Sequence, residues 1–329
     1  MRPSAQRPSN LPPSIHRSAP LEERRSSIGI ALVTAIIAII AIIVIIAMAA
    51  PLAGYTFEHF LVTSPHPYVA HLEINRPRKL NAFSPAVWQE YGAAFRQLSA
   101  DPAVRVVVLT GAGDRAFSAG LDVQEGSLTA VISEAAADAA RKATTLRRYI
   151  EEFQSCIGEM ERCEKPVICV LHGVSLGLAI DISCCADIRL CAADTRFSVK
   201  EVDIGLAADI GTLARLPKIV GSTSWVKDVC LSARDFGAQE ALSVGFVSQV
   251  HEDKARAVGA ALAMAKKLAD KSPVAVQGTK ELLNYGREHG TADSLRYTQV
   301  WNSAALQAQD VPAALMSMFQ KKTPTFEKL

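Results

Sequence analysis

The stretch KPVICVLHGVSLGLAIDISCCA, residues 165–186, carries the clearest signal for the fold of this 329-residue chain. Its first seven residues begin with Lys165 and continue as an apolar run that is typical of a strand buried inside a sheet. The dipeptide HG ends that run, and a helix is predicted from about 176 to 185. A buried strand that leads almost directly into an apolar helix indicates an α/β core.

Strands and helices alternate through most of the remaining chain. Further strands are predicted at 68–74, 104–110, 187–191 and 196–199. Helices are predicted from Pro85, behind Ser84 as N-cap, and at 127–163, 209–220, 238–244, 254–271, 273–288, 291–308 and 310–321. The sequence therefore predicts an α/β core over 55–255 and a helical C-terminal region over 256–329.

The N-terminal part has a different composition. Residues 1–27 are rich in Pro, Ser and Arg, and they are predicted to form a disordered tail. Residues 28–50 carry no charge, and as a helix they would span about 34 Å, enough to cross a hydrocarbon core of roughly 30 Å. A single transmembrane helix that anchors the protein to a membrane is predicted here. The alternatives are an unusual signal peptide or a mis-joined leading segment.

Charge and cysteine usage exclude several classes of protein. The formal net charge is +2, so the chain lacks the basic field that nucleic-acid-binding proteins use. None of the seven cysteines forms a C-x-x-C pair, which argues against a zinc site or a disulfide framework. The histidines form no H-x-x-x-H pair either. We expect no metal site and no nucleic-acid partner.

Three acidic residues are candidates for acid–base chemistry. Asp181 is the one ionisable group in an otherwise apolar helix, and isolation there would raise the pKa of its carboxyl group. It is either an acid–base or orienting group, or a structural carboxylate. Glu201 and Asp209 lie in a second apolar stretch, and Gly205 between them could let the chain turn back so that both reach one pocket. Alternatively, Asp209 simply caps the helix that follows it.

The loop FSAGLD, residues 117–122, provides a possible backbone contact with a ligand. The small residues around Gly120 let the main chain approach a bound molecule closely. Gly111 and Gly113 weakly suggest a dinucleotide motif, but the segment after them leads into FSAG rather than into a helix. A dinucleotide site is therefore not predicted.

Four motifs in this order resemble the crotonase, or enoyl-CoA hydratase/isomerase, superfamily over nearly all of 65–329. They are RPRKLNA at 76–82, AFSAGLD at 116–122, KPVICVLHG at 165–173 and GAQEALSVGFV at 237–247. Three further segments resemble the dienoyl-CoA isomerase branch of that superfamily: KEVDIGLAADIGTLARLPK at 200–218, SPVAVQGTK at 272–280 and WNSAALQAQD at 301–310. Related hydratases usually place Glu at the position of Asp181 and lack the acid at Asp209.

The resemblance implies a ClpP/crotonase-like spiral of ββα units with a helical C-terminal oligomerisation region, assembled as a homotrimer or homohexamer. It implies conversion of a 3,5-dienoyl-CoA to a 2,4-dienoyl-CoA in fatty-acid β-oxidation. Glu201 would remove a proton from carbon 2, Asp209 would deliver one to carbon 6, and Asp181 would support the site. The backbone N–H groups of Leu121 and Leu178 would form the oxyanion hole.

Acyl-CoA is the implied partner, and coenzyme A enters as part of the substrate, so no separate cofactor is expected. The resemblance implies that the substrate is contacted by Arg76, Lys79, Ala82, Ala119, Gly120, Asp122 and Ala179. Such enzymes belong to peroxisomes or mitochondria. The C-terminal tripeptide EKL differs from a peroxisomal Ser-Lys-Leu signal. Leu178 also departs from the Gly-Gly-Gly that many members have before the helical acid.

Two alternatives remain open at the level of sequence. The first is an enoyl-CoA hydratase or Δ3-Δ2-enoyl-CoA isomerase of the same superfamily. The second is a non-catalytic, membrane-tethered protein with the crotonase fold. The presence of all three acids favours the dienoyl-CoA isomerase over both.

Overall fold

Two sheets form the centre of the computed structural model, which describes residues 52–123 and 138–329. The larger sheet has the strand order β1-β2-β3-β5-β7-β10. Its strands are β1 (Phe60–His66), β2 (Val69–Ile74), β3 (Val106–Gly111), β5 (Val167–Leu171), β7 (Ile188–Ala192) and β10 (Gln249–His251). Only β1 and β2 pair antiparallel; the other neighbours in this sheet are parallel. The predicted α/β core is therefore confirmed.

The smaller sheet has the order β4-β6-β8-β9, made by β4 (Ala116–Ser118), β6 (Val174–Leu176), β8 (Arg196–Ser198) and β9 (Phe236–Gly237). Each of its first three strands directly follows a strand of the larger sheet along the chain: β4 follows β3, β6 follows β5 and β8 follows β7. The chain thus repeats the same strand–strand step as it winds, which is the spiral that the resemblance implies. The loops that join the two sheets lie next to the site described below.

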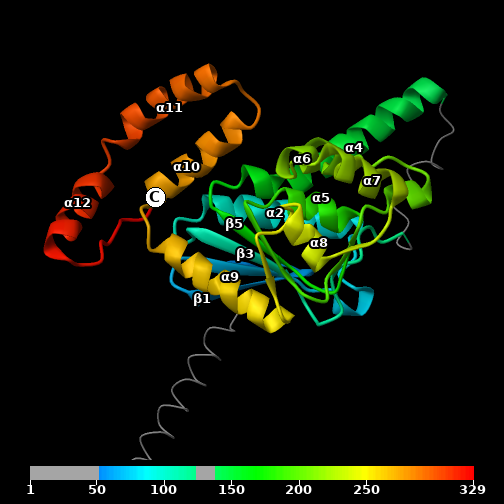
Figure 1. The fold of residues 1–329 in the computed structure, drawn as a ribbon, viewed down its shortest axis with the longest axis horizontal. Coiled ribbons are helices and arrows are strands. Elements are labelled where there is room, and N and C mark those ends of the chain that lie inside the picture. The colour runs from blue at the N-terminus through cyan, green and yellow to red at the C-terminus, as the bar shows by residue number, and fades with distance from the viewer. Residues whose placement is uncertain (1–51, 124–137) are drawn as a thin grey trace, which may run out of the picture. The chain divides into compact units, whose positions relative to one another are not determined.

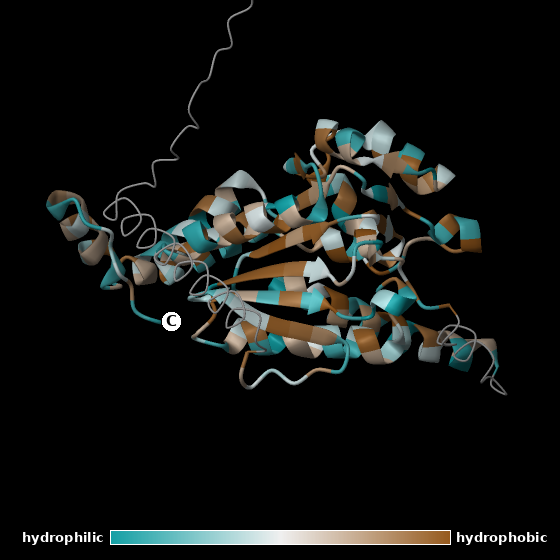
Figure 2. Ribbon diagram, turned by 90° about the horizontal axis from the view of Figure 1, so that it is seen from below, coloured by the Kyte–Doolittle hydropathy of each residue, from teal (hydrophilic) through white to brown (hydrophobic). Residues whose placement is uncertain are grey.

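Helices cover both faces of the larger sheet (Figure 1). On one face, α2 (Pro85–Ala100) and α4 (Ala139–Arg162) bury an aromatic cluster that includes Trp88, Tyr91, Phe95 and Phe153. On the other face, α9 (Lys254–Ala269) places alanines on the valines of β3 and the apolar side chains of β5. Because alanine is small, α9 can pack close to the sheet. Figure 2 shows the strands as a mostly hydrophobic layer between these helices.

Short helices complete the core, and longer ones form the C-terminal region. The short helices are η1 (Pro77–Lys79), α5 (Leu178–Cys184), η2 (Glu201–Ile204), α6 (Thr212–Ile219), α7 (Thr223–Ser232) and α8 (Ala238–Ser243). Beyond α9 follow α10 (Pro273–Gly286), α11 (Thr291–Ala305) and α12 (Asp310–Gln320), with no strand among them. Neither α11 nor α12 contains a buried residue. Figure 1 shows both helices extending away from the sheet.

The last residues of the chain return to the core. One terminal nitrogen of the buried Arg105, Nη2, donates to the carbonyl oxygens of Phe326, at 2.7 Å, and Glu327, at 3.0 Å. Its other terminal nitrogen, Nη1, donates to the carbonyl of Ala269 at the end of α9. Arg105 therefore joins the C-terminal tail to the start of the helical region.

Two predictions need correction. The transmembrane helix assigned to this fold finds no support, since no helix within 52–123 or 138–329 is both long enough and apolar enough to cross a bilayer. Residues 28–50, on which that prediction fell, lie outside the described residues, as does the tail 1–27. The capping role of Asp209 is also wrong: α6 begins at Thr212, and its N-cap residue is Gly211.

Candidate active site

All three candidate acids line one cavity of about 280 Å³. Parts of β6, α4, α5 and the segment 200–210 enclose it, and both predicted oxyanion residues take part. The lining residues include Leu121, Leu178, Asp181, Glu201 and Asp209. Residues from four separate parts of the sequence thus converge on one space.

Two backbone segments, one around Gly120 and the other at residues 176–178, meet at this cavity. Gly120 has a left-handed φ of 93°, and a Cβ atom there would lie 2.7 Å from the carbonyl oxygen of Leu176 and 3.5 Å from the amide nitrogen of Leu178. A side chain at position 120 would therefore separate the two segments.

The predicted oxyanion donors are the first residues past these contacts. The N–H of Phe83 donates to the carbonyl of Gly120, and the carbonyl of Phe83 accepts from the N–H of Asp122. The N–H of Leu121, between them, therefore points away from Phe83. Leu178 is the first residue of α5, where a backbone N–H has no partner within the helix. Two main-chain donors are thus placed beside the same space.

The buried side chain of Asn81 holds the first of these segments. Its Nδ2 donates to the carbonyls of Ala112 and Ala116, at 2.9 Å each, and its Oδ1 accepts from the N–H of Arg76. Ser118 in turn donates from Oγ to the carbonyl of Asn81. These contacts fix both ends of the 112–116 loop, which leads into the oxyanion segment. Asn81 adopts a φ of 55°, which asparagine tolerates better than most residues.

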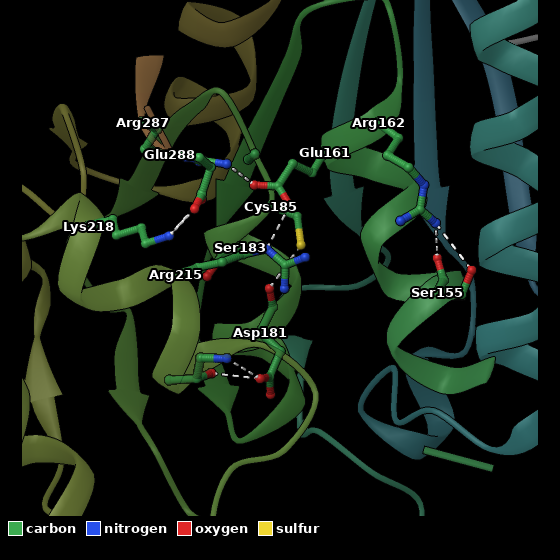
Figure 3. Close-up of polar contacts among 12 residues, drawn as sticks. Ser155, Glu161, Arg162, Asp181, Ser183, Cys185, Arg215, Lys218, Arg287 and Glu288 are labelled. Carbon is green, nitrogen blue, oxygen red and sulfur yellow. Dashed lines mark hydrogen bonds and ion pairs between the residues drawn. The ribbon is translucent and has the colours of Figure 1, made fainter. Parts of the chain in front are cut away.

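Asp181 lies in the first turn of α5 and is only 1% exposed. Both donors of Thr212 bond to its Oδ1, the N–H at 2.6 Å and Oγ1 at 2.8 Å (Figure 3). Burial raises the pKa of Asp181 to about 7, and the negative charge of Glu201 adds to the rise, while the bonds from Thr212 oppose it. This carboxyl group is fixed in place and titrates near neutral pH.

Glu201 is the first residue of η2, and its carboxyl group lies next to Gly177. Its Oε1 lies 3.3 Å from where a Cβ atom of Gly177 would stand, so the absence of a side chain makes room for the carboxyl group. Its Oε2 is buried and has no hydrogen-bond partner within the described part of the chain. Burial raises the pKa of Glu201, and the charge of Asp209 raises it further. A buried carboxylate oxygen without a donor is well suited to accept a proton.

Asp209 is the most accessible of the three acids. Its main chain is held by Gln154 of α4, whose Nε2 donates to the carbonyl of Asp209 at 2.5 Å. Partial burial raises the pKa of its carboxyl group. The side chain therefore lines the cavity while its backbone is tied to a neighbouring helix.

The rest of the cavity lining is apolar. Tyr149, Ile150 and Phe153 approach from α4, and Ile204 and Leu206 approach from the 200–210 segment. An apolar wall beside carboxyl groups suits a ligand with a hydrocarbon chain and one reactive polar group. No cluster of His, Cys, Asp and Glu able to hold a metal ion occurs among residues 52–123 and 138–329.

The predicted coenzyme A contacts are only partly at the cavity. Ala119 and Gly120 line it. Arg76 instead donates from Nη1 to the carbonyl of Ala82 at 2.5 Å and lies 3.4 Å from Asp122. Lys79 is exposed on η1, and Ala82 and Ala179 are buried without lining the cavity. The roles of all these residues in binding stay predictions.

Sequence reasoning missed Thr212 and assigned no role to Asn81. Asn81 lies within the quoted RPRKLNA motif, so a buried polar residue in a motif was the available signal. Thr212 follows Asp209 by three residues, but its partner Asp181 is 31 residues away. No local pattern links those two positions.

Comparisons with known proteins point to one family. Residues 66–328 match the family model described as enoyl-CoA hydratase/isomerase. The chain is 42% identical over 278 residues to the human protein named mitochondrial Delta(3,5)-Delta(2,4)-dienoyl-CoA isomerase. The aligned region covers 84% of each chain. It is 40% identical to the peroxisomal Delta(3,5)-Delta(2,4)-dienoyl-CoA isomerase of Arabidopsis thaliana, over 79% of this chain and 93% of that one.

The fold is also similar to solved structures. The crystal structure of an enoyl-CoA hydratase from Bacillus anthracis superimposes with a TM-score of 0.73 at 26% sequence identity. It covers 82% of this chain and 99% of its own. The crotonase fold predicted from the motifs is confirmed by the family match and by this similarity.

Proposed function

The chain belongs to the enoyl-CoA hydratase/isomerase family, and we propose that it isomerises 3,5-dienoyl-CoA to 2,4-dienoyl-CoA in fatty-acid β-oxidation. The observation that carries the proposal is the set of three carboxyl groups on one cavity, beside two backbone N–H donors. The human and Arabidopsis relatives are named for this reaction.

The two backbone donors supply the electrostatic part of the mechanism. The thioester oxygen of the substrate would accept from the N–H groups of Leu121 and Leu178. Loss of a proton from carbon 2 places negative charge on that oxygen, and one such donor typically contributes about 3 kcal/mol to the transition state. Because both donors belong to the main chain, the side chain of Leu178 need not take part.

The carboxyl groups move the proton. Glu201 takes a proton from carbon 2, and the electrons of that bond form an enolate whose negative charge the thioester oxygen carries. When that charge returns to the acyl chain, double bonds form between carbons 2 and 3 and between carbons 4 and 5, and carbon 6 takes a proton from Asp209. Asp209 must start protonated for this step, and the raised pKa of its carboxyl group favours that state. Proton exchange between Glu201 and Asp209 then restores the enzyme.

The reaction shifts two double bonds and changes no oxidation state, so it needs no electron acceptor.

Coenzyme A takes part as the carrier of the acyl group. We place Arg76 and Lys79 near its phosphates as part of the proposal, with Lys79 exposed on η1 for such a contact. Arg76 would have to rearrange, because it already contacts Ala82 and Asp122.

We also propose a homotrimer or homohexamer in a mitochondrion or peroxisome. Apolar side chains on α11 and α12 are exposed, among them Leu295, Leu306, Met318 and Phe319. Exposed apolar groups in such number are typical of surfaces that bind another chain. The relatives are named as mitochondrial and peroxisomal proteins. Light scattering of the purified protein measures the assembly.

The test is spectrophotometric. The purified protein receives a 3,5-dienoyl-CoA, and the absorbance of the conjugated 2,4-dienoyl thioester is followed with time. We expect a rise that is lost in Glu201→Gln and in Asp209→Asn. If no absorbance rises while the acyl-CoA still binds, the reaction is a different one of the family. Addition of water to crotonyl-CoA would then identify a hydratase, and movement of a single double bond a Δ3-Δ2 isomerase.

A further inference from the structure

Thr212 is the direct partner of the most deeply buried acid in the cavity. It is the first residue of α6, is fully buried, and directs both of its donors to the same oxygen of Asp181. Asp181 also lines the cavity. With Oδ1 engaged by Thr212, the other carboxyl oxygen is the one available to face the substrate.

The helix that carries Thr212 is itself fixed by ion pairs. Arg215, one turn further along α6, donates from Nε to Glu161 of α4 at 2.8 Å. Glu161 also pairs with Arg287, which follows α10, and Lys218 pairs with Glu288 at 2.6 Å (Figure 3). The helix is thus tied to two neighbouring elements. These ion pairs therefore hold Thr212 in place relative to α4 and to the residues after α10.

The electrostatic surroundings of Asp181 are mostly unfavourable to its anion. Glu201 and Asp209 add negative charge across the cavity. The other ionisable groups near it are Cys184 on its own helix, Cys185 directly after that helix and Cys230 on α7. Arg215 on α6 interacts with Cys184, Cys185 and Glu161. Burial raises the pKa of all three thiols, so they stay neutral. Thr212 is the group that bonds directly to the carboxylate.

We propose that Thr212 is a positioning residue of the isomerisation, whose hydroxyl and N–H together fix the Asp181 carboxyl group and stabilise its anionic form beside Glu201. The inference rests on the proposed function. An anion at Asp181 makes Glu201 a stronger base, because a like charge nearby disfavours a second negative charge. Thr212 would thus act on the proton transfer without touching the substrate.

The test compares Thr212→Val with Thr212→Ser. Valine keeps the shape and the backbone N–H but removes the hydroxyl donor, whereas serine keeps that donor. One hydrogen bond to a carboxylate contributes about as much as one pKa unit. We therefore expect the acid limb of the rate profile to move up by about one pH unit in Thr212→Val and to stay in place in Thr212→Ser.

A second measurement does not depend on activity. The titration of Asp181 is followed by NMR in protein labelled with ¹³C at the aspartate carboxyl carbon, and the signal is assigned by its loss in Asp181→Asn. Thr195→Val is the matched control, because Thr195 is also buried but bonds to the carbonyls of Leu171 and Ala192 outside the cavity. We expect the titration to move to higher pH in Thr212→Val alone.

The outcomes separate the two proposals. A Thr212→Val titration that superimposes on that of the unaltered protein overturns the role of Thr212. A displaced titration together with a displaced rate profile supports it. If the titration moves but the unaltered protein isomerises no dienoyl-CoA, the proposed function fails, and with it the catalytic meaning of the Thr212 contact.

Discussion

Two sides of the cavity present the same chemical group in opposite settings. The floor, formed by α5 with Asp181 and by Thr212, is buried and hydrogen-bonded. The wall, residues 200–210 with Glu201 and Asp209, contains a 3-10 helix without a buried residue, and Ile204 there is 58% exposed. The floor is therefore enclosed by the core, while the 3-10 helix of the wall is open to solvent.

The difference separates two requirements of a proton-transfer site. A group that sets the local field must not move, since reorganisation during the reaction would cost free energy. A group that exchanges protons with a substrate must be reachable and must not be held by donors of its own. Asp181 meets the first requirement, and Glu201, whose Oε2 has no partner among the described residues, meets the second.

The largest expected effect tests the wall. Glu201→Gln should lower kcat by about 10³-fold, within the range typical of a lost general base. The free energy of unfolding should stay the same or rise, because the variant removes a partly buried charge. Urea unfolding and the dienoyl assay measure the two quantities. Asp203→Asn is the control, since Asp203 lies in the same turn, pairs with Lys200 and does not line the cavity. Equal losses in both variants would contradict the comparison.

The next effect tests the floor through pH. The folded-state pKa of Asp181, about 7, lies above its ordinary value of 3.8, so the folded state holds this proton more tightly. The stability linked to it is present below pH 4 and is lost as the pH rises through 7. Asn cannot titrate, so Asp181→Asn should not lose this stability as the pH rises. Its free energy of unfolding, relative to that of the unaltered protein, should therefore increase by up to a few kcal/mol between pH 5 and 8. Urea unfolding at both values measures it; a constant difference would show that Asp181 does not titrate there.

A third variant asks whether the oxyanion segment is as rigid as the floor. Asn81→Asp replaces two donated hydrogen bonds with a carboxylate facing the carbonyls of Ala112 and Ala116. We expect a loss of about 2–3 kcal/mol in the free energy of unfolding, together with a lower kcat. Asn302→Asp on the exposed surface of α11 should change stability by less than about 0.5 kcal/mol. Similar values for the two variants would place the oxyanion segment with the adaptable wall.

The smallest effect concerns the apolar part of the wall. Ile204→Ala should change the free energy of unfolding by less than about 0.5 kcal/mol, because this side chain is mostly exposed. It lines the cavity, so the KM for long acyl chains should rise while that for short ones stays constant. Steady-state kinetics over a series of chain lengths measures the change. A uniform rise for all chain lengths would remove Ile204 from the acyl-binding surface.

The sequence predicted the parts of this molecule that depend on local pattern. The strand predicted at 165–171 is β5, which begins at Val167, and the helix predicted after it is α5, which contains Asp181. Both Glu201 and Asp209 reached one pocket, as the turn at Gly205 allowed. Such features follow from residue type and spacing over short distances.

The parts that were missed or wrong depend on distant contacts. The alternative role of Asp209 as a helix cap was wrong, because α6 begins three residues later at Thr212, which bonds to Asp181. The helix α7 was not predicted either. Propensity cannot reveal a bond between residues that meet only after the sheet has formed. The apolar segment 28–50 shows the opposite error, in which hydropathy alone determined the interpretation.

The contact of Arg105 with the tail has a consequence for chain entropy. One guanidinium group holds the carbonyls of Ala269, before α10, and of Phe326, after α12, so these helices form a closed loop. The entropic cost of closing a loop grows only slowly with its length, and extra residues between the helices should therefore be tolerated. Removing the last four residues, by contrast, would release one end and return the whole segment to the freedom of an open chain.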